Sequence, residues 1–400
     1  RFIKIAGKKE RQMQNNSFDL IIIGAGPGGY VGAIRASQLG MNVACIEKRP
    51  TLGGTCLNVG CIPSKALLNA SEHFASATSG RLGKLGISLG SVALDLKQMM
   101  QSKSDIVDTL TGGIDFLFKK NKITRLEGSA TITGAGSVTI VDGKDKGDYK
   151  AGKIMIATGS HPSSLPGITI DEKHIVSSTG ALSLETLPKK MVVIGAGYIG
   201  LELGTVWARL GAEVEVIEFL PRILPGMDAE IAKKFMTIAK KQGLKFRLST
   251  AVKSAKAEKN GVSLSVTPAN GGDEETIKAD IALVSVGRHP ATDGLGLEKI
   301  GVTMTPRGRI AVDARFETSI EDIYAIGDVI DGPMLAHKAE ADAVAAVVDY
   351  EIAGPAFVVE NREGHLQVQG PPRLRRLAHF PCGVRRPADC PRRRAAGDGR

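Results

Sequence analysis

Two cysteines five residues apart, Cys56 and Cys61, stand in the stretch GGTCLNVGCIPSK at residues 53–65. Such a pair can be buried packing, part of a metal site or a redox-active disulfide. A zinc site takes about four nitrogen or sulfur ligands, and no cluster of histidines or cysteines lies near this pair in the sequence. We therefore expect no metal here, which leaves a reactive disulfide and an inert core pair.

The local sequence favours reactivity. In a regular helix, residues five apart point about 140° away from each other, which suits a disulfide poorly. The glycines around the pair predict a distorted backbone that can bring the sulfurs together. Pro63 suits the first turn of a helix over PSKALLNASEHF, which would place Cys61 at the positive helix end. Together with Lys65 nearby, this environment favours a thiolate.

Two glycine-rich segments repeat one plan of apolar strand, glycine turn, helix and second strand. They read FDLIIIGAGPGGYVGAIRASQLGMNVACIEK from Phe18 and MVVIGAGYIGLELGTVWARLGAEVEVIE from Met191. Three glycines and a glutamate recur at one constant offset, as Gly24, Gly26, Gly29 and Glu47, then as Gly195, Gly197, Gly200 and Glu218. This is an internal duplication of a dinucleotide-binding βαβ unit.

The residue types in each copy suit a bound dinucleotide. The first glycine permits a tight turn, the second lets backbone N–H groups approach a pyrophosphate, and the third allows the helix to pack closely on the strand. The helix N-terminus stabilises the phosphate charge, and the glutamate accepts hydrogen bonds from ribose hydroxyls. A single motif of this kind is weak evidence, whereas two copies in the same context predict two nucleotide sites.

Two nucleotide sites and a thiol pair together define an electron path. A nicotinamide moves two electrons as hydride, a dithiol moves two through thiolate attack, and a flavin exchanges electrons with both. The first βαβ unit continues directly into the cysteine pair. We therefore expect it to bind FAD, and the second unit to bind the nicotinamide nucleotide.

The chain as a whole predicts an α/β fold with two Rossmann-like dinucleotide-binding domains, the first of them discontinuous. Helical patterns at 92–121 and near 227–242 alternate with short apolar strands, and two His-Pro pairs, at Pro162 and Pro290, mark the crossings between domains. The predicted parts are an extra N-terminal segment 1–16, the FAD-binding domain 17–158, the NAD-binding domain 159–286, the returning FAD-binding part 287–353, and an aberrant, disordered tail 354–400.

The charge distribution excludes a nucleic-acid footprint on the body of the protein. Of the formal net charge of +10, residues 1–16 carry +4 and residues 366–400 carry +7, so the part between them is close to neutral. No apolar run approaches the roughly 20 residues of a membrane span. Five cysteines in 400 residues do not form an extracellular disulfide framework, so we expect an intracellular, reducing compartment.

The sequence resembles the flavin disulfide reductases, and within them the dihydrolipoamide dehydrogenase branch. The resemblance rests on GGTCLNVGCIPSKALL, IGAGPGGYV, IATGS, VIGAGYIGLELG, YAIGDV and MLAHKAE, and covers about residues 17–350. It implies a homodimeric enzyme that takes electrons from dihydrolipoamide on lipoyl domains of 2-oxoacid dehydrogenase or glycine-cleavage complexes. The electrons pass through the disulfide and FAD to NAD⁺. The implied compartment is bacterial cytoplasm or the mitochondrial matrix.

The resemblance also implies roles for particular residues. Cys56 is the thiol that exchanges with substrate, Cys61 the thiol beside the flavin, and Lys65 with Glu202 a charged pair near the flavin. The implied FAD-binding positions are Gly24, Gly26, Gly29, Glu47, Lys48, Thr55, Gly128, Thr158, Gly159, Asp328, Ala336 and His337. The implied NAD-binding positions are Gly195, Gly197, Gly200, Glu218, Val252 and Gly287. Glu218 predicts NAD, because a carboxylate repels a 2′-phosphate.

The sequence departs from this family after about Ala353. The family has a C-terminal dimerisation domain with a His-Pro motif and a following glutamate, and neither His-Pro pair of this chain has a glutamate close behind it. We therefore expect a truncated or frame-shifted chain whose dithiol deprotonation is slower by about 10²–10⁴. The alternatives are another flavin disulfide reductase, of glutathione or mercuric reductase type, and a catalytically dead FAD- and NAD-binding scaffold.

Overall fold

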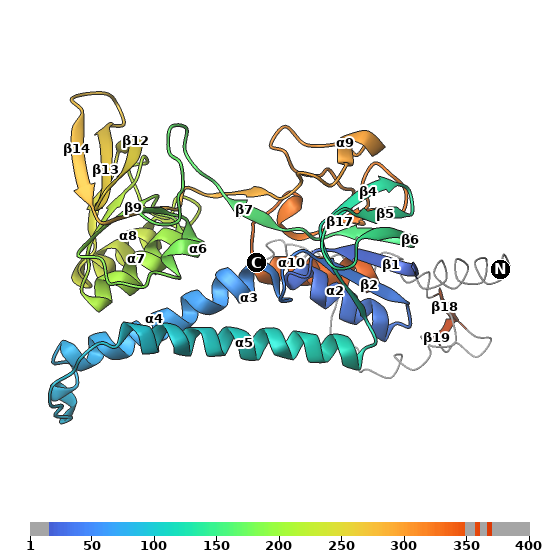
Figure 1. The fold of residues 1–400 in the computed structure, drawn as a ribbon, viewed down its shortest axis with the longest axis horizontal. Helices are drawn as coiled ribbons and strands as arrows, with labels where there is room; N and C mark the ends of the chain where they lie inside the picture. Colours follow the sequence, from blue (N-terminus) through green and yellow to red (C-terminus); the bar gives the residue numbers. More distant parts are fainter. Residues whose placement is uncertain (1–15, 349–356, 361–365, 370–400) are drawn as a thin grey trace, which may run out of the picture. The chain divides into compact units, whose positions relative to one another are not determined.

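The first sheet of the computed structural model, which describes residues 16–348, 357–360 and 366–369, has seven strands (Figure 1). Their order is β3-β2-β1-β6-β5-β4, with β17 also paired to β6. The strands β1, β2, β3, β6 and β17 run parallel, and β4 and β5 add an antiparallel hairpin beside β6. The bounds are β1 Ser17–Ile23, β2 Val43–Glu47, β3 Thr124–Glu127, β4 Ala130–Gly134, β5 Ser137–Ile140, β6 Gly147–Ile156 and β17 Ile323–Ala325.

The central strand β1 is continuously apolar from Leu20 to Ile23 because both of its faces are covered there. Leu20 and Ile22 pack into one cluster, which also holds buried side chains of the helices on that face, and Ile21 and Ile23 pack into a second cluster on the other face. A parallel strand buried on both faces reads as a continuous apolar run rather than an alternating one. The apolar run that predicted this strand therefore results from the burial of the sheet between a layer on each of its faces.

The helices of this part include two long ones whose ends are set by identifiable residues. Asp95 accepts a hydrogen bond from the Gln98 backbone N–H at 2.9 Å and caps α5, so this helix begins later than the predicted residue 92. Helices α4 and α5 lie side by side, and α10 packs against α2 (Figure 1). The bounds are α2 Pro27–Gln38, α3 Gly54–Val59, α4 Cys61–Thr78, η1 Gly83–Leu85, α5 Leu96–Lys120, α9 Leu297–Ile300, η2 Gly327–Val329 and α10 Ala336–Val348.

The second sheet has five strands, all parallel, in the order β11-β10-β9-β15-β8. Helix α7 lies on one face of this sheet, and the antiparallel sheet β12-β13-β14 lies on the other (Figure 1). The bounds are β8 Ile175–Val176, α6 Ser178–Ala181, β9 Lys190–Ile194, α7 Tyr198–Leu210, β10 Glu213–Ile217, α8 Ala229–Lys241, β11 Lys245–Arg247, β12 Thr250–Glu258, β13 Gly261–Pro268, β14 Glu275–Ala279 and β15 Ile281–Val284.

Two short strands carry the chain from one sheet to the other and back. They are β7, Ser160–Pro162, and β16, Arg288–Pro290, and they pair antiparallel with His161 opposite His289. The predicted domain boundaries at 158/159 and 286/287 fall just before these strands. The first sheet is thus built from segments on both sides of the second, since β17 pairs with β6.

Two short segments within the predicted tail 354–400 form strands. The strands β18, Phe357–Glu360, and β19, Leu366–Gln369, pair antiparallel. The first is rich in β-forming side chains and the second alternates apolar and polar residues, a pattern typical of strands. The rest of that tail, like residues 1–15 and the predicted loss of a dimerisation domain, lies outside the described residues. Among the described helices, none is long and apolar enough to cross a bilayer.

Candidate active site

The backbone between the two cysteines breaks at Gly60. Helix α3 ends at Val59, Gly60 takes a non-helical conformation (φ −142°, ψ −112°), and α4 begins with Cys61. A Cβ at residue 60 would lie 2.8 Å from the Thr55 carbonyl oxygen, closer than real Cβ atoms approach a backbone atom. Glycine therefore permits the change of direction that brings the two thiols within hydrogen-bonding reach. The distortion expected from the sequence is thus located at one residue.

The two thiols differ in acidity. A hydrogen bond from Cys56, with a further contribution from Lys65, outweighs burial and lowers the pKa of Cys61 to about 7. The same hydrogen bond, together with burial and the negative charge of Cys61, raises the pKa of Cys56 far above its usual range. In the reduced pair the negative charge therefore resides on Cys61, and Cys56 keeps its proton.

Helix α4 brings Lys65 to Glu202 on α7. The Lys65 Nζ lies 2.6 and 2.8 Å from the two Glu202 carboxylate oxygens, and the Ser64 hydroxyl donates to Oε2 at 2.9 Å. Since 60% of the Lys65 side chain and 31% of the Glu202 side chain are exposed, this ion pair contributes at most about 1 kcal/mol. Its chemical effect is electrostatic, because the Lys65 cation favours the Cys61 thiolate and the Glu202 carboxylate opposes it.

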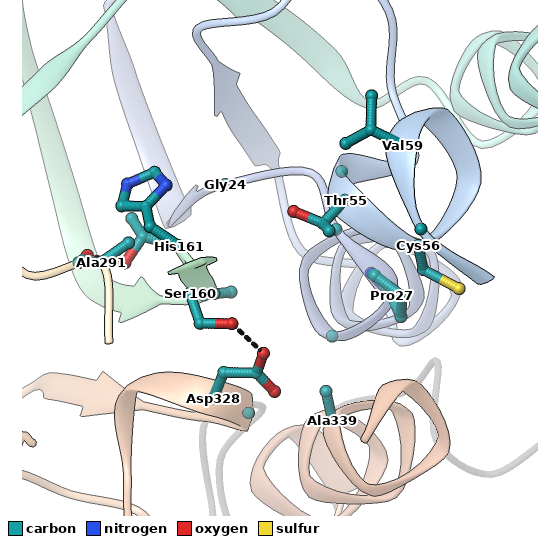
Figure 2. Close-up of a pocket in the computed structure, with 18 of the residues that line it drawn as sticks. Gly24, Pro27, Thr55, Cys56, Val59, Ser160, His161, Ala291, Asp328 and Ala339 are labelled. Carbon is teal, nitrogen blue, oxygen red and sulfur yellow. Dashed lines mark hydrogen bonds between the residues drawn. The ribbon is translucent and has the colours of Figure 1, made fainter. Parts of the chain in front are cut away.

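A cavity of about 500 Å³ opens beside the cysteine pair (Figure 2). It is lined by both cysteines, by Lys65 and Glu202, and by ten of the twelve predicted FAD positions: Gly24, Gly26, Glu47, Lys48, Thr55, Gly128, Thr158, Gly159, Asp328 and Ala336. The two others do not line it. Gly29 packs beneath the loop, where a Cβ would lie 1.8 Å from the Gly24 carbonyl oxygen, and His337 is outside the lining.

The first glycine loop has the features a pyrophosphate requires. Gly24 has a φ of +100°, and Gly26 precedes the first residue of α2. A Cβ on Gly54, the first residue of α3, would lie 2.5 Å from the Gly26 Cα, so two helix N-termini meet here with no side chains between them. Bare backbone N–H groups at helix N-termini form an anion site, and this cradle therefore fits the diphosphate of FAD.

The glutamates of the two βαβ copies, Glu47 and Glu218, fold back on their glycine loops in the same way. Glu47 is buried and accepts from the Ala25 N–H at 2.9 Å, and Glu218 is buried and accepts from the Ala196 N–H at 2.7 Å. Each second carboxylate oxygen accepts from a backbone N–H two residues further on, at 2.9 Å. The carboxylates are therefore fixed beside their loops, and their remaining lone pairs can accept from ribose hydroxyls.

A second cavity, of about 740 Å³, lies at the second glycine loop. Five of the six predicted NAD positions line it: Gly195, Gly197, Glu218, Val252 and Gly287. Gly200 does not, because it packs where a Cβ would lie 2.4 Å from the Gly195 carbonyl oxygen, as Gly29 does in the first copy. A Cβ on Gly197 would meet nothing within 4 Å, so this position leaves room for a phosphate, and the cavity fits a second dinucleotide.

Sequence reasoning missed several residues of the site. Ser160 donates to the Asp328 carboxylate at 2.5 Å (Figure 2), and Arg288 donates in turn to Ser160. Tyr198, Ile199, Arg288 and Met334 line both cavities. Ser160 and Arg288 each directly follow a predicted glycine position, Gly159 and Gly287, which is the one signal in the sequence that could have drawn attention to them. Among the described residues, no group of three or more metal-ligating side chains is placed to hold a metal ion.

Comparison with known proteins identifies the family. Residues 18–343 match the family model of the pyridine nucleotide-disulphide oxidoreductases. Mitochondrial dihydrolipoyl dehydrogenase of Pisum sativum is 52% identical over 355 residues, which cover 86% of this chain and 70% of that protein. The Mesocricetus auratus protein of that name is 54% identical (82% and 69% covered), and leghemoglobin reductase of Glycine max is 52% identical (86% and 68% covered).

A solved structure of a flavoprotein disulfide reductase has a fold similar to that of this chain. The copper(II) complex of the HOCl-induced flavoprotein disulfide reductase RclA from Escherichia coli superposes with a TM-score of 0.72 at 28% identity, covering 83% of this chain and 70% of that one. The chain spans between 63% and 70% of the length of the plant and animal relatives named dihydrolipoyl dehydrogenase or leghemoglobin reductase. The chain therefore belongs to the pyridine nucleotide-disulphide oxidoreductase family, as a dihydrolipoyl dehydrogenase-like flavoprotein with FAD and NAD as its cofactors.

Proposed function

We propose that this chain takes two electrons from dihydrolipoamide and passes them through a Cys56–Cys61 disulfide and FAD to NAD⁺. One observation carries the proposal: Cys56 and Cys61 both lie in the wall of the first cavity, and that cavity shares wall residues with the second. A dithiol, a flavin and a nicotinamide therefore have adjacent places in one molecule. The assignment of FAD to the first cavity and NAD to the second belongs to this proposal.

The difference between the two thiols sets the order of the sulfur chemistry. A substrate thiolate attacks the Cys56 sulfur of the disulfide, so that a mixed disulfide forms and Cys61 leaves as a thiolate. The second substrate thiolate then attacks the substrate sulfur that is bonded to Cys56 in the mixed disulfide. This step closes the substrate disulfide and releases Cys56, whose sulfur takes up a proton. The low pKa makes Cys61 the better leaving group, and the high pKa of Cys56 holds the proton there.

The residues of this chain hold the cofactors in defined ways. The glycine loops and the helix N-termini would bind the two diphosphates, and Glu47 and Glu218 would bind the adenosine riboses. Asp328 would accept from the ribityl chain of the flavin. FAD, when bound, supplies the exchange between the thiol pair and the hydride of the nicotinamide.

The second cavity favours NAD over its 2′-phosphorylated form. The Glu218 carboxylate is buried at the cavity wall, and Phe219 and Leu220 follow it with no basic side chain. A 2′-phosphate placed beside Glu218 would be repelled by this fixed negative charge.

The substrate is proposed to reach the chain on lipoyl arms. The partners would then be lipoyl domains of 2-oxoacid dehydrogenase or glycine-cleavage complexes, and a homodimer would be the natural assembly of the family. The mitochondrial names of the plant and animal relatives support a mitochondrial matrix location, with bacterial cytoplasm as the alternative.

The test is an anaerobic visible spectrum of the purified chain, titrated with dihydrolipoamide and then with NAD⁺. We expect loss of the oxidised flavin band with a long-wavelength charge-transfer shoulder, and recovery on NAD⁺ addition. Cys56→Ser and Cys61→Ser should each abolish reduction by dihydrolipoamide, while NADH should still bleach the flavin of both variants.

Two results would contradict the proposal. Flavin that ignores dihydrolipoamide but bleaches with NADH in the wild-type chain would identify a scaffold that carries both nucleotides without dithiol activity. Undiminished dihydrolipoamide reduction in either cysteine variant would remove that thiol from the path.

A further inference from the structure

Arg288 belongs to the lining of both nucleotide cavities. Four residues are shared between the two linings, and Arg288 is the charged one among them; the other three are Tyr198, Ile199 and Met334. It lies on β16, the strand on which the chain returns from the second sheet to the first. A substitution of Arg288 can therefore affect ligand binding in both cavities.

The guanidinium of Arg288 is bound on the flavin side by Ser160. Its Nε donates to the Ser160 hydroxyl at 2.7 Å, and its Nη2 donates to the Ser160 carbonyl oxygen at 2.6 Å. The pairing of β7 with β16 holds these two residues together, since Ser160 lies opposite Pro290 in that ribbon. Two of the three guanidinium nitrogens are thereby used.

The Ser160 hydroxyl links Arg288 to Asp328 through two hydrogen bonds. Because it accepts from Arg288, its own hydrogen is free to point at the Asp328 carboxylate, to which it donates at 2.5 Å (Figure 2). Hydrogen bonds in such a series polarise one another, and those to charged groups are the stronger ones. One Asp328 oxygen is thus fixed in direction, and the carboxylate cannot turn without breaking the series.

The third nitrogen, Nη1, has no hydrogen-bond acceptor among the residues that the structure describes. Arg288 is half-buried, and the loss of solvent contact lowers its pKa, while the charges of Asp328, Tyr198 and Cys61 act in the opposite direction. A guanidinium stays protonated in proteins, so a charged N–H group at the cavity wall remains available to a ligand.

We infer that Arg288 is a positioning residue shared by the two nucleotide sites. Through Ser160 it fixes the Asp328 carboxylate for the ribityl chain of the flavin, and with its Nη1 it contacts the nucleotide in the second cavity. This inference rests on the proposed function, since it takes FAD to occupy the first cavity and NAD⁺ the second.

The test is a binding comparison of Arg288→Met, Ser160→Ala and the double variant. FAD affinity of the flavin-depleted chain is measured by flavin fluorescence, and NAD⁺ affinity of the FAD-loaded chain by calorimetry. We expect each single variant to weaken FAD binding by about 10-fold, the effect of losing one hydrogen bond to a charged group. The double variant should be no weaker than the worse single variant, because both act through one series of hydrogen bonds.

NAD⁺ binding separates the two halves of the inference. Arg288→Met should weaken it several-fold, whereas Ser160→Ala should leave it unchanged. The matched control is Arg247→Met on β11, which removes an arginine paired with Glu215 of β10 and Glu275 of β14. Arg247 lines neither cavity, so this variant should change neither affinity. The thermal midpoint of each variant shows whether it has folded.

Three outcomes would overturn the inference. FAD losses that multiply to about 100-fold in the double variant would show that Arg288 and Ser160 act independently. An unchanged NAD⁺ affinity in Arg288→Met would remove the second contact. Absence of FAD binding in the wild-type chain would overturn both this inference and the proposed function, whereas a wild-type flavin that ignores dihydrolipoamide would overturn the proposed function alone.

Discussion

At the scale of single residues, the site works by placing one negative charge on one of two sulfurs. Cys56 and Cys61 share a hydrogen bond, and the pKa of Cys61 falls to about 7 because the Cys56 thiol donates to it. Helix α4 contributes its N-terminus and Lys65 to the same side. The asymmetry of the pair is therefore a property of its position at the start of a helix as much as of the two side chains.

This asymmetry predicts the pH dependence of thiol alkylation. In the reduced, flavin-free chain, modification of Cys61 by iodoacetamide should rise with pH, be half-maximal near pH 7, and be about 10-fold slower at pH 6 than at pH 8, since only the thiolate reacts. Peptide mass mapping over time gives the rate at each cysteine. Cys56→Ala should move the midpoint upward towards the ordinary value of about 8.5; an unmoved midpoint would mean that Cys56 does not acidify its neighbour.

A second residue-scale prediction concerns the choice of nucleotide. Glu218→Gln keeps an oxygen acceptor for the loop but removes the charge, so NAD⁺ binding should weaken by about 10-fold, and the preference over NADP⁺ should shrink. Calorimetric titration with both nucleotides checks this. The control is Glu213→Gln, at the start of β10, the strand that ends just before Glu218. The Glu213 carboxylate pairs with exposed Lys245, so its loss should change neither affinity. An equal loss in both variants would disprove a specific role for Glu218.

At the scale of elements, what the sequence could predict was local. The glycine turns, the acids at the strand ends and the helix starts are encoded within about 25 residues each, and the apolar strands follow from burial on both faces. The hydrogen bonds among Arg288, Ser160 and Asp328 join segments far apart in the chain, on β16, β7 and η2, so no local pattern encodes them. The paired strands β18 and β19 were missed because an Arg- and Pro-rich tail outweighed two short β-like runs.

The helix break between the cysteines gives an element-scale prediction. Gly60→Ala should destabilise the chain by about 1–3 kcal/mol, since the new Cβ would clash with the Thr55 carbonyl or force the break to change. Gly112→Ala is the matched control: this exposed position inside α5 has nothing within 4 Å of a Cβ, and alanine there should stabilise the helix by about 0.5–1 kcal/mol. Urea unfolding measures both, and a neutral Gly60→Ala would contradict the account of the break.

At the scale of the whole molecule, α4 ties the two nucleotide-binding parts together. It follows the first βαβ unit in the chain, separated from it only by the short helix α3. Its buried Leu67 nevertheless belongs to the same core cluster as Trp207 and Val193 of the second unit. Arg209 on α7 adds an ion pair of 2.6 Å to Glu72 on α4. The stability of each part therefore depends on the other.

This tie can be measured with the single tryptophan of the chain. Trp207 is fully buried on α7, so its fluorescence reports on the second part. Leu67→Ala should cost about 2–5 kcal/mol and lower the urea midpoint seen by Trp207, although residue 67 precedes the second part in sequence. The comparison is Leu126→Ala, in the cluster of the first sheet that also contains Ile21 and Ile23. If the two parts unfold together, both variants should lower the urea midpoint of the Trp207 fluorescence. If the parts unfold separately, Leu67→Ala should lower this midpoint and Leu126→Ala should leave it unchanged.

The ribbon of β7 and β16 makes the second part, in polymer terms, a closed loop of the first. The Ser163 N–H donates to the Gly287 carbonyl oxygen at 3.0 Å, so the two ends of the intervening chain meet within one hydrogen bond. A chain inserted between neighbouring points costs its host little entropy, and its removal asks only for a short turn in its place. The connections of the chain would therefore allow the second part to be removed. The obstacle is the side of α4 that packs on the second part, because removal would expose this side to water. A shortened chain with a turn between β7 and β16 would need polar replacements on that helix before it could stand alone.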